Sequence, residues 1–144
     1  MSALAVTVLG IPVPQGSMKS LGRGRLVHSN DANLRPWRDT VAWHVREDML
    51  SAGVVTLEGP VSVAATFTLP RPKSAPARRW APDRKPDIDK LLRALLDACT
   101  AGGAWVDDAQ VVTVAVNKVY AAGSNVPGVT FTVAPAERGT AVAA

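Results

Sequence analysis

Two aspartates stand one residue apart at the start of an apolar helical pattern. The stretch K-P-D-I-D-K-L-L-R-A-L-L-D-A, residues 85–98, places Asp87 and Asp89 in front of apolar residues spaced three and four positions apart. An Asp at a helix start often caps the helix, because its carboxylate accepts backbone N–H bonds. Local sequence alone favours capping, although capping requires only one of the two acids. The alternative is that both carboxylates bind a cation.

A second acidic pair, Asp107 and Asp108, follows the predicted helix and a Gly-Gly turn. Two acids before a strand are by themselves an ordinary turn signal. If the turn leads the chain back along the helix, Asp108 can approach Asp87 and Asp89, and three converging carboxylates repel one another unless a cation is bound. Because no His or Cys stands beside these oxygen ligands, the expected ion is Mg²⁺, with Mn²⁺ as the alternative. Such an ion supports phosphodiester hydrolysis.

Basic residues concentrate in two stretches, residues 15–30 and 70–86, in a chain whose formal net charge is +4. Basic loops in isolation are usually solvated surface, but beside an acidic metal site we interpret them as contacts to a nucleic-acid backbone. The residues expected to contact DNA are Lys19, Arg23, Arg25, Arg71, Lys73, Arg78, Arg79, Arg84, Lys85 and Lys90.

Hydrophobic periodicity predicts how these residues are positioned. Strands are expected at residues 4–9, 61–69, 111–120 and 129–133, and helices at 34–51 and 88–101. We expect the last two strands to pair as a hairpin, and Pro36 to lie in the first turn of the first helix. Residues 15–30 are predicted to be a loop or loose hairpin, with 25–28 as its strand half, and the proline-rich segment 70–86 a surface loop. The fold class is α+β, a mixed or antiparallel sheet of four to five strands with two main helices on one face.

The length of 144 residues indicates a single domain, which we place at residues 1–134, followed by a flexible tail at 135–144. The single cysteine, Cys99, cannot form an intrachain disulfide, so we expect a reducing, cytoplasmic setting. The first ten residues lack the basic region of a signal peptide, and nowhere do 18 apolar residues run together. We therefore expect no membrane association.

The stretch at residues 85–98, followed by A-G-G-A-W-V-D-D-A-Q-V-V, closely resembles the RusA family of Holliday junction resolvases, many of which are encoded by phages and prophages. The resemblance is strongest over residues 85–118 and looser upstream, in G-S-M-K-S, R-L-V-H-S-N and W-R-D-T-V. It implies a RusA-like fold, and that Asp87, Asp89 and Asp108 bind the catalytic Mg²⁺.

The resemblance also implies a catalytic role for a basic residue one helical turn after the second acid, which is Arg93 here. Two positions depart from the usual motif, since Asn commonly stands in place of Lys90 and Lys in place of Arg93. Arg keeps the charge and can grip a phosphate with two donors, but it cannot give up a proton as Lys can. Arg93 can therefore still stabilise negative charge on the phosphate, but a role as a general acid does not carry over to it.

The function implied is a Mg²⁺-dependent endodeoxyribonuclease that resolves Holliday junctions by paired cleavage in DNA recombination and repair. A homodimer is expected, because a four-way junction must be cut on two opposed strands. The apolar run at residues 111–119 is one possible interface. The alternatives are a nuclease acting on replication forks or other branched phage DNA, and a non-catalytic branched-DNA-binding protein whose acids only cap and turn.

Other residues carry two interpretations each. Asp97 could form an ion pair with Arg93 four residues earlier or support the metal ligands, or it could be a solvated helix acid. Asp107 could also support the metal site, although a turn residue is the preferred interpretation. Trp80 could stack on an unpaired base or be partly buried against the sheet. The remaining tryptophans, expected in the core or an interface, are Trp37, Trp43 and Trp105.

Overall fold

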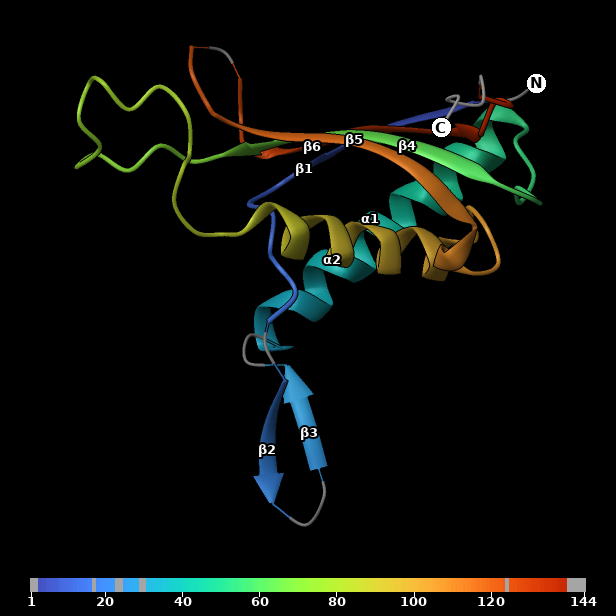
Figure 1. The fold of residues 1–144 in the computed structure, drawn as a ribbon, viewed down its shortest axis with the longest axis horizontal. Helices are drawn as coiled ribbons and strands as arrows, with labels where there is room; N and C mark the ends of the chain where they lie inside the picture. Colours follow the sequence, from blue (N-terminus) through green and yellow to red (C-terminus); the bar gives the residue numbers. More distant parts are fainter. Residues whose placement is uncertain (1–2, 17, 23–24, 29–30, 124, 140–144) are drawn as a thin grey trace, which may run out of the picture.

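The computed structural model describes residues 3–16, 18–22, 25–28, 31–123 and 125–139, and it describes no side chains for residues 18–22, 25–28 and 31. A four-stranded sheet carries two helices on one face, and a two-stranded hairpin projects away from this body (Figure 1). The predicted α+β class, with a mixed sheet and two helices on one face, is confirmed. None of the described helices is long and apolar enough to cross a membrane.

The sheet has the strand order β1 (Leu4–Leu9), β6 (Gly128–Pro135), β4 (Val61–Leu69) and β5 (Val111–Tyr120). Strand β6 is antiparallel to both β1 and β4, whereas β4 and β5 are parallel. The predicted hairpin between the last two strands is therefore wrong. The chain crosses from β4 to β5 through a helix, a connection that makes neighbouring strands parallel, and β6 then pairs on the other side of β4.

Helix α1 (Asp31–Ala52) begins three residues before the predicted start, so that Pro36 lies inside the helix instead of in its first turn. The carbonyl of Pro36 accepts a hydrogen bond from Thr40 Oγ1 at 2.8 Å. Helix α2 (Ile88–Gly102) begins where predicted and ends one residue later. Gly103 ends it in a left-handed conformation with a φ of 89°, where its N–H points to the carbonyls of Cys99 and Thr100.

The core lies between the sheet and the helices, and alternate residues of β1, β4 and β6 point into it. Trp37 and Trp105 are buried as predicted, whereas Trp43 is 53% exposed. Gly102 permits a close crossing of the two helices, since a Cβ built on it would lie 2.7 Å from the Ala42 carbonyl oxygen. Burial raises the pKa of the Cys99 thiol, which keeps it neutral.

The segment predicted as a loop or loose hairpin forms an antiparallel pair, β2 (Met18–Gly22) and β3 (Arg25–His28). Of the basic residues assigned to it, Arg23 lies outside the described residues, and only the backbone of Lys19 and Arg25 is described. At the other end of the chain β6 continues through Pro135, two residues beyond the predicted strand. Residues 140–144 lie outside the described part of the chain, so the domain limit at residue 134 stays a prediction.

Candidate active site

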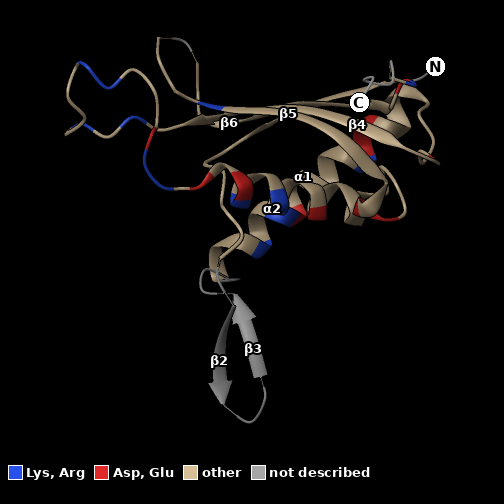
Figure 2. Cartoon of the chain, in the orientation of Figure 1, with Lys and Arg blue, Asp and Glu red and all other residues tan. Residues whose placement is uncertain are grey.

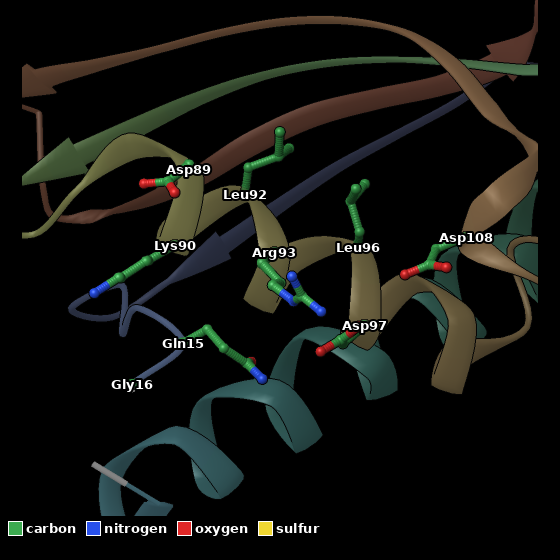
Figure 3. Close-up of a pocket in the computed structure, with 9 residues that line it drawn as sticks. All are labelled: Gln15, Gly16, Asp89, Lys90, Leu92, Arg93, Leu96, Asp97 and Asp108. Carbon is green, nitrogen blue, oxygen red and sulfur yellow. The ribbon is translucent and has the colours of Figure 1, made fainter. Parts of the chain in front are cut away.

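A pocket of about 810 Å³ opens along α2, between the segment that follows β1 and the turn that precedes β5 (Figure 3). Helical spacing puts residues 89, 92, 93 and 96 on the side of α2 that faces this pocket, while Leu91 and Leu95 are buried on the opposite side. The residues that line the pocket are Gln15, Gly16, Asp89, Lys90, Leu92, Arg93, Leu96, Asp97 and Asp108.

Asp87 occupies the N-cap position of α2, but its carboxylate makes no capping hydrogen bond. The capping interpretation, which local sequence favoured, is therefore wrong for this side chain. Its negative charge still lies at the positive end of the helix dipole, where it is favourable. Asp87 is exposed and does not line the pocket.

The turn that carries Asp108 is held by a network centred on Gln110. Asp107 Oδ1 accepts a hydrogen bond from the Ala109 N–H at 2.9 Å, and Gln110 Oε1 accepts from the Asp107 N–H at 3.1 Å. Together these bonds form a capping box on the short 3₁₀ helix η1 (Asp108–Gln110). The preferred interpretation of Asp107 as the turn residue is thus confirmed.

Gln110 also ties this turn to the segment before β4, and sequence reasoning assigned it no role. Its Nε2 donates hydrogen bonds to the carbonyls of Leu57 at 3.0 Å and Gly59 at 2.9 Å. The capping-box spacing, Asp followed three residues later by Gln, is visible in the sequence and could have identified it. The two long-range bonds have no sequence signal.

Lys118 on β5 is a second residue that sequence reasoning missed. Its ammonium donates hydrogen bonds to the carbonyls of Arg84 and Pro86, the turn that leads into Asp87. In the parallel register Lys118 lies beside Phe67, which is fully buried, so its aliphatic stem runs along the covered side of the sheet. A lone lysine in a β-branched run carries little sequence signal.

The structure brings Asp89 and Asp108 to one pocket but does not gather three carboxylates. Figure 3 shows the two acids at opposite ends of the pocket, with Leu92 and Leu96 between them. Within the described ranges, no three His, Cys, Asp or Glu side chains lie close enough together to hold a metal ion. The expected convergence of Asp87, Asp89 and Asp108 is therefore absent from this conformation.

The donor atoms nevertheless fit Mg²⁺ or Mn²⁺ in chemical type. Among the described residues, the carboxylates of Asp87, Asp89 and Asp108 take part in no hydrogen bond or ion pair, and all three are exposed. Mg²⁺ usually keeps several water ligands and is bound through one or two carboxylates plus substrate phosphates. Asp89 and Asp108, which line one open pocket, meet that requirement when phosphate oxygens supply the other ligands.

Arg93 projects into the pocket from α2 and is exposed (Figure 3). Of the alternatives for Asp97, the ion pair with Arg93 is not formed, and Asp97 lies 3.9 Å from Arg38 on α1. The guanidinium of Arg93 makes no ion pair within the described part of the chain, so all its donors remain available. Asp97 lines the pocket and links the two helices.

Basic positions follow the loop between β4 and α2 and continue onto α2 (Figure 2). Some of them are engaged within the loop, since Arg71 donates to two carbonyls and Arg79 and Arg84 both approach Asp83. The exposed cations of this loop that form neither an ion pair nor a side-chain hydrogen bond among the described residues are Lys73, Arg78 and Lys85. These three side chains are therefore free to contact a phosphate.

The family model described as endodeoxyribonuclease RusA matches residues 10–133, which include the whole pocket. The chain belongs to the RusA family. The chain is similar to the crossover junction endodeoxyribonucleases RusA of Escherichia coli strain K12 and of Enterobacteria phage 82, and it is 34% identical to each over 88 residues. That alignment covers 61% of this chain and 62% of each relative, so the chain spans less than two thirds of these RusA proteins. The resemblance drawn from the sequence is confirmed.

Proposed function

We propose that this RusA-family protein is a divalent-cation-dependent endodeoxyribonuclease that cuts four-way DNA junctions on two opposed strands. One observation carries the proposal. Two acids from separate segments, Asp89 on α2 and Asp108 before β5, line a single pocket together with the unpaired Arg93. The relatives are named crossover junction endodeoxyribonucleases, which supports the same substrate class.

Asp87, Asp89 and Asp108 are the residues that would hold Mg²⁺ or Mn²⁺. When bound, the ion supplies activation of the attacking water and neutralises charge on the scissile phosphate. The protein's own contribution is to hold its carboxylates near an open pocket and to place Arg93 beside them, where a guanidinium can donate two hydrogen bonds to one phosphate. Asp97 and Asp107 support the site indirectly, through α1 and through the turn at Asp108.

The basic residues position the DNA. Lys73, Arg78 and Lys85 lie along the loop that leads into α2, and Lys90 lines the pocket itself. Phosphate contacts of this kind fix the register of the protein on DNA and make its affinity fall with salt. We extend the same role to Lys19 and Arg25 on the projecting hairpin, and to Arg23, which lies outside the described residues, on the basis of their charge and position in the sequence.

A homodimer would supply two active sites for the two cuts. Strand β5 is at the edge of the sheet, and Val112 and Val114 on it are 62% and 43% exposed. An edge strand with exposed β-branched residues is a suitable surface for pairing with a second copy. We propose this edge as the dimer interface, and the cytoplasm as the compartment in which the protein meets DNA.

The test compares synthetic four-way junctions, forks and linear duplexes, each incubated with the purified protein in Mg²⁺ or in EDTA. The proposal predicts paired nicks at symmetric positions in the four-way junction, only in Mg²⁺, with linear duplex left intact. Preferential cutting of the fork would favour the second candidate, a nuclease for replication forks. Binding of branched DNA without any metal-dependent cutting would reject both nuclease assignments.

A further inference from the structure

Trp80 is the most exposed large apolar side chain among the described residues, at 87% exposure. It lies in the proline-rich loop, residues 70–87, which extends from the end of β4 beyond the sheet before it returns to α2 (Figure 1). The alternative of partial burial against the sheet is therefore wrong. A single exposed hydrophobic residue is common on protein surfaces. Its setting in this loop decides what it can do.

The loop is braced on the side that precedes Trp80. Arg71 donates hydrogen bonds to the carbonyls of Pro76 at 2.8 Å and Arg79 at 2.7 Å, and its guanidinium lies over the Tyr120 ring, 5.1 Å from the centroid. The carbonyl of Arg79 belongs to the peptide bond that joins Arg79 to Trp80. The conformation that exposes the indole is thus tied to the rim of the sheet.

The loop is also cross-linked across Trp80. Arg79 Nε lies 3.6 Å from Asp83 Oδ1, which spans the tryptophan, and the Asp83 N–H donates to the Ala81 carbonyl at 2.9 Å. Five prolines further limit the freedom of this loop. A braced loop loses little backbone conformational entropy on binding, so the position from which Trp80 projects is preorganised for a partner.

The charge around Trp80 selects the partner. Arg78 and Arg79 precede it, Arg84 and Lys85 follow it, and Asp83 is the single acid among these neighbours. Arg78 and Lys85 form no ion pair in the described structure, so they can contact phosphates. An aromatic ring flanked by free cations is the arrangement that binds single-stranded nucleic acid, with bases stacked on the ring and the backbone held by the cations.

We propose that Trp80 stacks on an unpaired or unstacked base at the branch point of the DNA, while Arg78 and Lys85 hold the adjoining phosphates. This inference rests on the proposed function and deepens it. In linear duplex every base is stacked inside the helix and offers no free face, whereas strands that exchange at a branch interrupt the stack. Trp80 thus contributes to selection of branched DNA more than to general affinity.

The test measures binding without cutting, in EDTA, of a four-way junction and a linear duplex of equal length. Trp80→Ala is expected to weaken junction binding about 5- to 150-fold, the range for loss of one stacked base, and to change duplex binding less than about twofold. Trp80→Phe is expected to keep most of the junction affinity. Trp43→Ala is the matched control, because Trp43 is 53% exposed and lies on α1, outside the proline-rich basic loop.

A second readout locates the contact. With 2-aminopurine at the branch point, the wild type and Trp43→Ala should change the probe's fluorescence on binding, and Trp80→Ala should not. The inference is overturned if Trp80→Ala binds the junction as the wild type does, or if it weakens junction and duplex binding equally. It is also overturned if Trp80→Ala lowers the molecular mass of the protein assembly in solution, because Trp80 then belongs to an interface between protein copies.

Failure of this inference and failure of the proposed function are distinguishable. A protein that never cuts in Mg²⁺ but loses junction binding in Trp80→Ala retains the stacking contact and loses the nuclease assignment. A protein that cuts junctions in Mg²⁺ and binds them equally well with or without Trp80 retains the nuclease assignment and loses the stacking contact.

Discussion

The Lys118 ammonium lies 2.7 Å from the carbonyl oxygen of Pro86 and so ties the edge strand β5 to the last residue before Asp87. A second hydrogen bond, of 2.8 Å, reaches the carbonyl of Arg84. These two bonds fix the end of the long loop at the point where the acidic motif begins. Lys118, which does not line the pocket, thereby helps to position Asp87 and the start of α2.

Replacing Lys118 by Met removes both bonds and keeps the aliphatic stem. We expect cleavage to fall about 10- to 100-fold, the usual cost of losing a group that orients a metal ligand. Backbone amides of residues 84–90 should exchange with solvent faster, while junction binding in EDTA stays near the wild-type value. Lys118→Arg should restore part of the protection of these amides against exchange. Unchanged exchange and cleavage in Lys118→Met would show that this lysine does not position the motif.

The network at Gln110 predicts a loss of stability when this side chain is replaced. Gln110→Ala removes hydrogen bonds to the carbonyls of Leu57 and Gly59 and from the N–H groups of Val106 and Asp107. We expect the free energy of unfolding to fall by about 1–3 kcal/mol, measured by urea denaturation, because partly buried groups lose their partners. Gln110→Glu keeps the acceptor and loses the donor, so it should fall between the wild type and the alanine variant.

The close helix crossing at Gly102 gives a prediction about the fold alone. A Cβ at this position would lie 2.7 Å from the Ala42 carbonyl oxygen and 2.9 Å from the Val45 Cβ. Gly102→Ala should therefore force the helices apart and cost about 1–3 kcal/mol of unfolding free energy, despite the better helix propensity of Ala. Ala101→Ser, at an exposed neighbouring position, is the control and should change stability by less than about 0.5 kcal/mol. Equal stability of the two variants would contradict the packing.

Arg93 tests the electrostatic part of the mechanism. Arg93→Ala removes a cation that has no other partner in the described structure, and we expect the single-turnover cleavage rate to fall about 100-fold or more. Arg93→Lys restores the charge, and the family usually has Lys at this position, so it should keep most of the rate. An equal loss of cleavage rate in both variants would mean that the planar, two-donor geometry of the guanidinium matters more than its charge.

Local patterns predicted the elements well, because each depends on a few neighbouring residues. The period of the apolar residues from Ile88 onward and the Gly-Gly stop gave α2 to within one residue. The strand-type residue pattern predicted β4, and it predicted the start of β6 to within one residue. The pairing of these strands depends on which side of β4 each strand joins, which no local pattern records, and so the expected hairpin between β5 and β6 was wrong.

The site shows the same division. The motif at residues 87–89 and Asp108 identified the acids that face or flank the pocket, and the turn did lead the chain back to α2. What could not be predicted are contacts between distant segments. Lys118 reaching Pro86 and Asp97 pairing with Arg38 instead of Arg93 both depend on how α1, α2 and β5 pack.

The central claim is that Asp89 and Asp108 bind one divalent ion when DNA occupies the pocket. The direct test is an EPR titration of Mn²⁺ into the protein bound to a four-way junction that carries uncleavable linkages at the branch, with the junction alone as the blank. The control variant is Asp107→Asn, which removes a neighbouring charge but keeps a side chain that caps as well as Asp. We predict bound Mn²⁺ in the wild type and in Asp107→Asn, and its loss in both Asp89→Asn and Asp108→Asn. Retention of wild-type Mn²⁺ binding in Asp89→Asn and Asp108→Asn would contradict the account.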